Sequence, residues 1–169
     1  MKKLLLIVFC FPLLTLAQQT YVPDDNFEAY LEANGMGNGI ANDDSVTTSN
    51  INTITSLDVS SKAIIDLTGI EDFSALTNLN CHNNQLTSLD VSQITALYKL
   101  DCGANQLTSL DVSQITALYN LDCSVNHLTS LDLSQNSALT YLFCENNQLT
   151  NLDLSQNTAL TEVFFTNNQ

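Results

Sequence analysis

The sequence predicts a solenoid, in which short coils stack in a row and share one parallel β-sheet. The main observation is a 21-residue phrase, LYKLDCGANQLTSLDVSQITA, that begins at Leu97. Close copies of the phrase begin at Leu76, Leu118 and Leu139, and a shortened copy begins at Leu160. A fixed period of this length indicates units that pack only on their neighbours. The second observation is that the apolar positions recur with the same period, so that stacking would bury them in one continuous core.

Within the phrase, the apolar residues and one asparagine follow the pattern L-x-x-L-x-C-x-x-N-x-L, as at Leu97, Leu100, Cys102, Asn105 and Leu107. This pattern resembles the leucine-rich repeat, with cysteine in the third apolar position. The resemblance covers the chain from about residue 54 to the end. It implies a leucine-rich-repeat solenoid, either of the α/β horseshoe class or β-rich, with a parallel β-sheet on its concave face. Apart from a short N-terminal cap helix, little helix is expected.

Residues 1–17, MKKLLLIVFCFPLLTLA, predict a secretory signal peptide that is cleaved after Ala17. Two lysines precede an apolar run that is too short to span a bilayer comfortably. Cys10 is not expected to carry a lipid, because the bulky Phe9 precedes it. The prediction is therefore a protein that is secreted to the extracellular space or the cell surface, without membrane insertion after cleavage.

Residues 18–53 differ from the repeats and predict an N-terminal cap, which covers the apolar surface that the first coil would otherwise expose. The segment PDDNFEAYLEANG predicts a short helix that starts at Asp24 or Asp25 and stops at Asn34-Gly35. Its apolar face would hold Phe27, Tyr30 and Leu31. This helix, followed by ITSLDVSSKAIIDLTGIEDFSAL, resembles the cap and first repeat of internalin-like bacterial surface proteins.

The solenoid is expected over residues 54–169, and its first repeat, 54–75, is degenerate and carries Lys62 where the others have asparagine. Four regular repeats and a partial one would follow, at 76–96, 97–117, 118–138, 139–159 and 160–169. No polar closing unit follows the partial repeat, whose last residues include Phe164 and Phe165. The chain is therefore expected to be a fragment of a longer product, to fray in its last coil, or to associate end to end.

The charge balance favours some partners over others. The sequence has four lysines against 18 aspartates and glutamates, and signal cleavage would remove Lys2 and Lys3. Nucleic acid and anionic membrane surfaces are disfavoured, because no basic patch could neutralise phosphates. Cationic partners and divalent metal ions would be attracted.

Equivalent residues of successive coils should stack in columns about 4.8 Å apart. One column contains Cys81, Cys102, Cys123 and Cys144. Because the slot is apolar and Phe165 replaces the fifth cysteine, buried free thiols are favoured, with disulfides between neighbouring coils as the alternative. A second column, with a structural role in turns and side-chain amide ladders, contains Asn84, Asn105, Asn126, Asn147 and Asn168.

A third column contains Asp90, Asp111, Asp132 and Asp153, each in an L-D-[VL]-S phrase. Full ionisation would cost about 1–4 kcal/mol for each neighbouring pair. Turn amides, the neighbouring serine hydroxyls, raised pKa values or bound cations could offset that cost. Solvated turn capping is favoured, and a row of Ca²⁺ ligands is the alternative. No other cofactor is expected.

The remaining variable positions lie on the predicted concave face, where the strand residues of the pattern x-L-x-[LC]-x point outward. The early coils present mainly small polar and acidic groups, and the late coils present an aromatic cluster flanked by glutamates. A cluster of this kind is a candidate binding site, although drift of the copies or cover by further coils would also explain it. The candidate ligand-binding residues are Lys99, Asp101, Asp122, Tyr141, Phe143, Glu145, Glu162 and Phe164.

Catalysis is not expected. The two histidines, His82 and His127, occupy different repeat positions, and a histidine beside Asp101 would be the sole candidate for a dyad. The sequence contains no phosphate-binding loop, metalloprotease motif or nucleophile elbow. The favoured function is non-catalytic recognition of a protein or glycan through the concave face, and the alternative is a rigid spacer in a larger secreted or surface protein.

Overall fold

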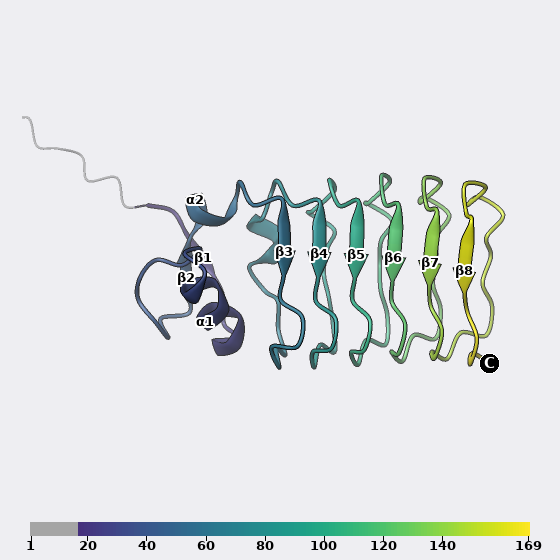
Figure 1. Ribbon diagram of the computed structural model, residues 1–169, viewed down its shortest axis with the longest axis horizontal. Coiled ribbons are helices and arrows are strands. Elements are labelled where there is room, and N and C mark those ends of the chain that lie inside the picture. The colour runs from purple at the N-terminus through teal and green to yellow at the C-terminus, as the bar shows by residue number, and fades with distance from the viewer. Residues whose placement is uncertain (1–16) are drawn as a thin grey trace, which may run out of the picture.

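The structure is a single row of coils with a small cap at its N-terminal end (Figure 1). It is a computed structural model that describes residues 17–169, so the predicted signal peptide, except for Ala17, lies outside the described residues. Each coil contributes one three-residue strand to a six-stranded sheet. The strands are β3 (Ser56–Asp58), β4 (Asn78–Asn80), β5 (Lys99–Asp101), β6 (Asn120–Asp122), β7 (Tyr141–Phe143) and β8 (Glu162–Phe164).

All six strands are parallel, and each pairs in register with the strand of the next coil. Leu79 therefore lies between Leu57 and Leu100, and the equivalent residues of the later coils continue the column. From β4 onward the register follows from the constant 21-residue spacing, and the first coil reaches the same register with one additional residue. The predicted leucine-rich-repeat solenoid, with a parallel sheet and little helix, is confirmed.

The core lies between the sheet and the returning segments of the coils. The central leucine of each strand from β3 to β7 is almost fully buried, while its two neighbours on the strand stay at least partly exposed. This alternation is the period of two that a strand requires. In β8 the equivalent residue, Val163, is only partly buried, because no coil covers its outer side in this chain.

The cap consists of two helices and a two-stranded antiparallel sheet. The helices are α1 (Asp25–Ala33) and α2 (Thr48–Ile51), and the strands are β1 (Gln19–Tyr21) and β2 (Ser45–Thr47). Helix α1 buries Phe27 and Leu31 completely, and Phe27 stacks on Phe73 of the first coil with ring centroids 6.4 Å apart. The structure thus places residues 19–51 as a unit that packs on the first coil.

Asp24, rather than Asp25, is the N-cap of α1. Its Oδ1 accepts hydrogen bonds from the backbone N–H groups of Asn26 and Phe27, both at 2.9 Å. Its Oδ2 accepts hydrogen bonds from Ile65 N at 2.8 Å and Asp66 N at 3.1 Å, which belong to the first coil. One buried carboxylate therefore caps the helix and attaches it to the solenoid.

Two further contacts join the cap to the first coil. The ammonium of Lys62, at the position that holds asparagine in the later coils, lies 5.5 Å from the centre of the Tyr30 ring. Gly69 precedes the 3₁₀ helix η1 (Ile70–Asp72) with a φ of 100°, and a Cβ there would lie 2.7 Å from Tyr21 O. Glycine is therefore required by both the backbone conformation and the close approach of β1.

Within the part of the chain that the structure describes, no helix is long and apolar enough to cross a membrane.

Candidate recognition face

The candidate site is the outward face of the six-stranded sheet, where variable side chains stand on a regular backbone. Its central column takes one residue from each strand, and the first four are acidic or amide residues while the last two are aromatic. In order along the chain the column contains Asp58, Asn80, Asp101, Asp122, Phe143 and Phe164. The face therefore changes chemically from β3 to β8, as the sequence predicts.

The carboxylates of this column are partly engaged in the local turn. Oδ1 of Asp101 accepts a hydrogen bond from Gly103 N at 3.1 Å, and Oδ1 of Asp122 accepts one from Ser124 N at 3.0 Å. Burial raises the pKa of Asp101 above its ordinary value, although the bond from Gly103 N opposes this shift. Each carboxylate keeps a second oxygen that is free of this turn bond.

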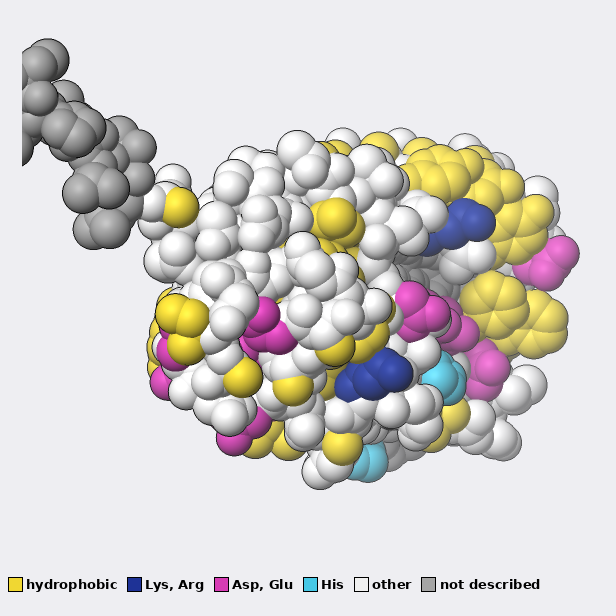
Figure 2. All heavy atoms as spheres, turned by 60° about the vertical axis from the view of Figure 1, so that its left-hand side comes forward, with side chains coloured by type: hydrophobic (Ala, Val, Ile, Leu, Met, Phe, Trp, Pro, Cys, Tyr) yellow, Lys and Arg dark blue, Asp and Glu magenta, His cyan; other side chains and the backbone are white. Residues whose placement is uncertain are grey.

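The aromatic side chains form two stacks on the coils of β5 to β8. Phe143 and Phe164 are parallel, with ring centroids 5.1 Å apart and planes at 8°. Tyr98 and Tyr119 are parallel at 4.7 Å and 4°, and Tyr141 meets Tyr119 edge to face at 5.2 Å. We call these five side chains the aromatic patch. Figure 2 shows hydrophobic side chains gathered on this side of the molecule, with acidic groups beside them.

Tyr98 and Tyr119 are members of this patch that sequence reasoning missed. They stand immediately before the strand, one position outside the pattern that defines the outward face. Only the side-chain stacking across coils brings them to Tyr141, which is one of the predicted residues. The sequence does carry a signal, because the position held by Thr77 in one repeat is held by Tyr98 and Tyr119 in the next two.

Beside the aromatic patch, the early strands form a shallow hollow of about 290 Å³. Its lining includes Asp58, Lys99 and Asp101, together with asparagines of β4 and β6. Of the predicted residues, Lys99 and Asp101 line this hollow, whereas Tyr141, Phe143 and Phe164 belong to the aromatic patch. Asp122 lies between these groups, and Glu145 and Glu162 are on the late coils.

His82 and Asp101 are brought together, with Nδ1 3.3 Å from Oδ1. The nearby Ser124 hydroxyl donates its hydrogen bond to Asp122 Oδ1, at 2.7 Å, and not to the histidine. Gly103 lies between these groups, and a Cβ there would be 3.0 Å from both His82 Nδ1 and Asp122 Oδ1. The arrangement is a close contact between an imidazole and a carboxylate, without an activated nucleophile.

The asparagine row joins each coil to the coil before it. Oδ1 of Asn126 accepts a hydrogen bond from Leu107 N at 2.9 Å, and its Nδ2 donates to Cys102 O at 3.0 Å and Cys123 O at 3.2 Å. The other members of the row repeat this pattern. The bonds go to backbone groups, so the expected side-chain amide ladder is wrong in this detail, because inward-facing amides reach the backbone first.

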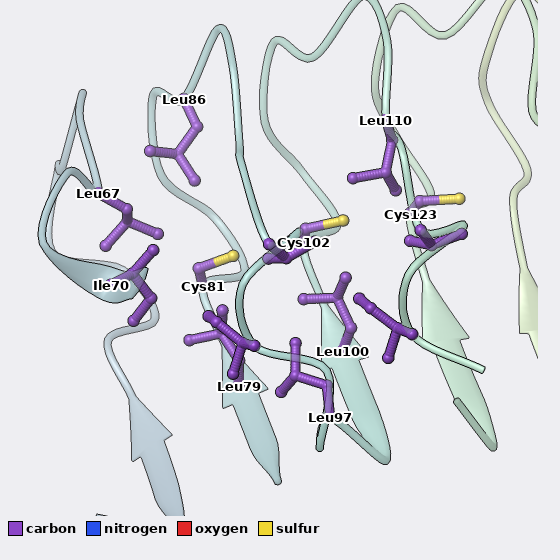
Figure 3. Close-up of a cluster of buried hydrophobic side chains, with 14 of the residues drawn as sticks. Leu67, Ile70, Leu79, Cys81, Leu86, Leu97, Leu100, Cys102, Leu110 and Cys123 are labelled. Atoms are coloured by element: carbon purple, nitrogen blue, oxygen red, sulfur yellow. The ribbon is translucent and has the colours of Figure 1, made fainter. Parts of the chain in front are cut away.

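Cys81, Cys102, Cys123 and Cys144 form a buried row of free thiols, and Figure 3 shows the first three. The labelled sulfurs lie in the core beside the leucines of their coils. The thiols of Cys81 and Cys102 donate to carbonyl oxygens of the next coil at 3.4 Å. Burial raises the pKa of Cys102 and Cys123 well above the ordinary value and raises that of Cys144 to about 11. Protonated thiols therefore act here as small apolar side chains.

The aspartate row consists of repeated turns. In each, Oδ1 of the aspartate accepts a hydrogen bond at 2.9 Å from the backbone N–H of the serine two residues later. These bonds lower the pKa of Asp90, Asp111, Asp132 and Asp153. Turn amides thus provide the compensation, and the alternative of raised pKa values is wrong. Binding of Ca²⁺ by this row stays a prediction.

The coils, the sheet and the cap together define a capped leucine-rich-repeat solenoid. Known proteins with a similar structure include internalins. A solved functional domain of internalin J from Listeria monocytogenes, described as including a cysteine ladder, superposes with a TM-score of 0.77 and 42% identity. The match covers 90% of this chain and 34% of that one. The internalin inlF of the same species has a TM-score of 0.65 and 25% identity, over 88% of this chain and 51% of that one.

Internalin J of Listeria monocytogenes serotype 4b (strain F2365) is also similar in sequence, with 45% identity over 75 residues. That match covers 44% of this chain, which spans 8% of the length of the relative. No protein-family model matches the chain. The chain is an internalin-like leucine-rich-repeat protein.

Proposed function

We propose that this chain is a non-catalytic recognition module that binds a protein partner through the concave face of its sheet, outside the cytoplasm. The internalin-like leucine-rich-repeat fold supports a protein-interaction repeat module. The aromatic patch carries the proposal: Tyr98 and Phe164 are 42% and 48% exposed, on a sheet face that otherwise presents polar groups. Partly exposed tyrosines and phenylalanines are typical anchors of interfaces. The predicted signal peptide supports the location.

The charge around the patch favours a partner with basic side chains. Glu145 lies two residues after Phe143, just beyond β7, and Glu162 lies two residues before Phe164 on β8. Asp101 and Asp122 lie on the two preceding strands of the sheet. Lys99 is the single lysine of these strands. Lysine and arginine side chains would pair with the carboxylates and also lie over the aromatic rings. Binding should therefore weaken with salt, since such contacts are screened.

The test is affinity capture with the purified chain as bait, comparing the wild-type protein with Phe143→Ser/Phe164→Ser. The matched control is Thr108→Ala/Thr129→Ala, which changes two exposed residues in the returning segments of their coils, outside the strands. We expect a partner retained by the wild type and the control and lost by the phenylalanine variant, with an unchanged thermal transition. Equal retention by all three proteins would contradict the proposal.

The same experiment separates the alternatives. A partner released by glycosidase treatment and insensitive to salt would indicate a glycan ligand instead of a basic protein. If no partner is retained by any of the three proteins, the proposal fails and the spacer role is favoured.

A further inference from the structure

A second candidate site lies in the cap, away from the recognition face. Carboxylate oxygens of Asp25, Glu28 and Asp44 all lie within 4.8 Å of one another. Asp25 and Glu28 are one turn apart on α1, so they project from the same side of the helix. Asp44 comes from the loop before β2, which the hydrogen bond from Val22 N to Asp44 O fixes at 2.9 Å. Folding thus brings together three acidic groups from two segments.

Glu28 provides a second, independent observation. Its side chain is 1% exposed, and its Oε1 accepts a hydrogen bond from Asp43 N at 3.1 Å. Its Oε2 is buried and has no hydrogen-bond partner within residues 17–169. A buried carboxylate oxygen without a donor is costly, and nearby carboxylates increase that cost by repulsion. Among the described residues, no histidine or cysteine belongs to the cluster.

We propose that Asp25, Glu28 and Asp44 form a Ca²⁺ site that fastens the loop of residues 35–44 to α1. All three ligands are carboxylate oxygens, which hard cations prefer. Ca²⁺ fits better than Mg²⁺, because a loop and a helix give irregular geometry and the exposed Asp25 and Asp44 leave room for water ligands. The ion would supply the missing partner of Glu28 Oε2 and remove the repulsion among the three groups.

This site differs from the aspartate row of the solenoid. Each carboxylate of that row already accepts a backbone hydrogen bond in its own turn. The cap cluster combines groups from two segments, and its buried oxygen accepts no bond. The inference is also independent of the proposed recognition function, because it concerns the opposite end of the molecule.

The test is calorimetric titration of the chelator-treated chain with CaCl2, together with thermal unfolding in millimolar CaCl2 and in EDTA. The variants are Glu28→Gln and Asp44→Asn. Glu32→Gln is the control, because Glu32 lies on the same helix and also bonds the loop, through Asn38 N and Gly39 N, but is outside the cluster. Asp44 is exposed, so Asp44→Asn keeps the test available if Glu28→Gln does not fold.

We expect one Ca²⁺ per chain and a higher melting temperature in CaCl2 than in EDTA. Both cluster variants should lose at least roughly tenfold in affinity, since fewer ligand charges weaken such sites, while Glu32→Gln should keep the wild-type affinity. In EDTA, Glu28→Gln should melt no lower than the wild type, because it removes an unpaired buried charge.

Equal melting temperatures in CaCl2 and EDTA, with no heat of binding, would overturn the proposal. So would a Ca²⁺ response that survives Glu28→Gln and Asp44→Asn but is lost in Asp111→Asn/Asp132→Asn, which would assign the ion to the aspartate row. The proposal would also be overturned if lowering the pH raised the melting temperature equally with and without Ca²⁺, because a proton and not Ca²⁺ would then relieve the repulsion in the cluster.

Discussion

At the scale of single residues, Asp24 has the clearest structural role. It is 5% exposed and accepts four backbone hydrogen bonds, two from α1 and two from the first coil. Replacing it with alanine removes the helix cap and leaves Ile65 N and Asp66 N without acceptors. We expect Asp24→Ala to lower the free energy of unfolding by about 2–4 kcal/mol.

Urea unfolding followed by circular dichroism measures this change through the midpoint. Asp24→Asn is the matched variant. Its amide oxygen can accept the bonds either from α1 or from the first coil, while its NH₂ group faces the other pair of N–H donors and cannot accept from them. It should lie between the wild type and Asp24→Ala. A midpoint for Asp24→Ala equal to that of the wild type would show that this carboxylate does not hold the cap.

The asparagine row allows a similar prediction at a position where the coils meet. Asn126 is 4% exposed, and its amide bonds to backbone groups of two coils. Asn126→Ala leaves Leu107 N buried without an acceptor, so we expect a loss of about 2–4 kcal/mol in the free energy of unfolding. The neighbouring His127 is exposed, and His127→Ala serves as the control. Equal urea midpoints for the two variants would contradict the assigned role.

At the scale of the repeated element, the cysteine row predicts a pattern of reactivity. Burial keeps these thiols protonated, and the thiolate is the reactive form. A thiol reagent should therefore label Cys102 and Cys123 only as fast as the chain unfolds. Cys144 should react first of the four, since a single coil follows it.

Mass spectrometry of partly labelled protein gives the order directly. Rapid labelling of all four cysteines under native conditions would show that the row is open to solvent. Absence of label after full unfolding without reductant would instead indicate disulfides, contrary to the free thiols of the structure.

The aspartate row predicts how stability depends on pH. Its turn hydrogen bonds lower the folded-state pKa of these carboxyls below their ordinary value, so ionised carboxylates favour the fold. That contribution is complete above the unfolded-state pKa and is lost as the pH falls through the lowered folded-state pKa. Stability should therefore decline on acidification below about pH 4.

Asp111→Asn/Asp132→Asn tests this origin, because asparagine can still accept the serine N–H bond but does not titrate there. The variant should show a shallower loss of stability with acid than the wild type, measured by urea unfolding at several pH values. Identical acid profiles would place the sensitivity elsewhere. Protonation of Asp101 has the opposite effect on stability. Burial raises its folded-state pKa, so protonation at low pH removes an unfavourable buried charge.

At the scale of the whole molecule, the repeat phrase was sufficient to predict the solenoid and the parallel sheet. The repeated apolar pattern brings Leu57, Leu79 and Leu100 into register, although the first coil is one residue longer than the second, so one motif fixes the topology. It also predicted the inward cysteines, because their slot alternates with outward residues. The cap helix followed from its own capping residues, although the choice between Asp24 and Asp25 depended on contacts with the first coil.

The remaining features depend on contacts between segments that no local pattern encodes. Tyr98 and Tyr119 join the aromatic patch by stacking across coils from a position outside the strand. The cluster around Glu28 requires the loop that carries Asp44 to fold back on α1. Repetition predicts what is common to all coils, whereas the candidate sites arise where a coil or the cap departs from the repeat.

Hydroxyl-radical footprinting of the chain with its captured partner tests the concave-face proposal most directly, because aromatic side chains are efficient reporters. Tyr21, in β1 of the cap, is 61% exposed and serves as the internal control. The proposal predicts strong protection of Tyr98, Phe143 and Phe164 by the partner, with unchanged oxidation of Tyr21. Unchanged oxidation of the aromatic patch in a saturated complex would place the binding surface elsewhere and contradict the proposal.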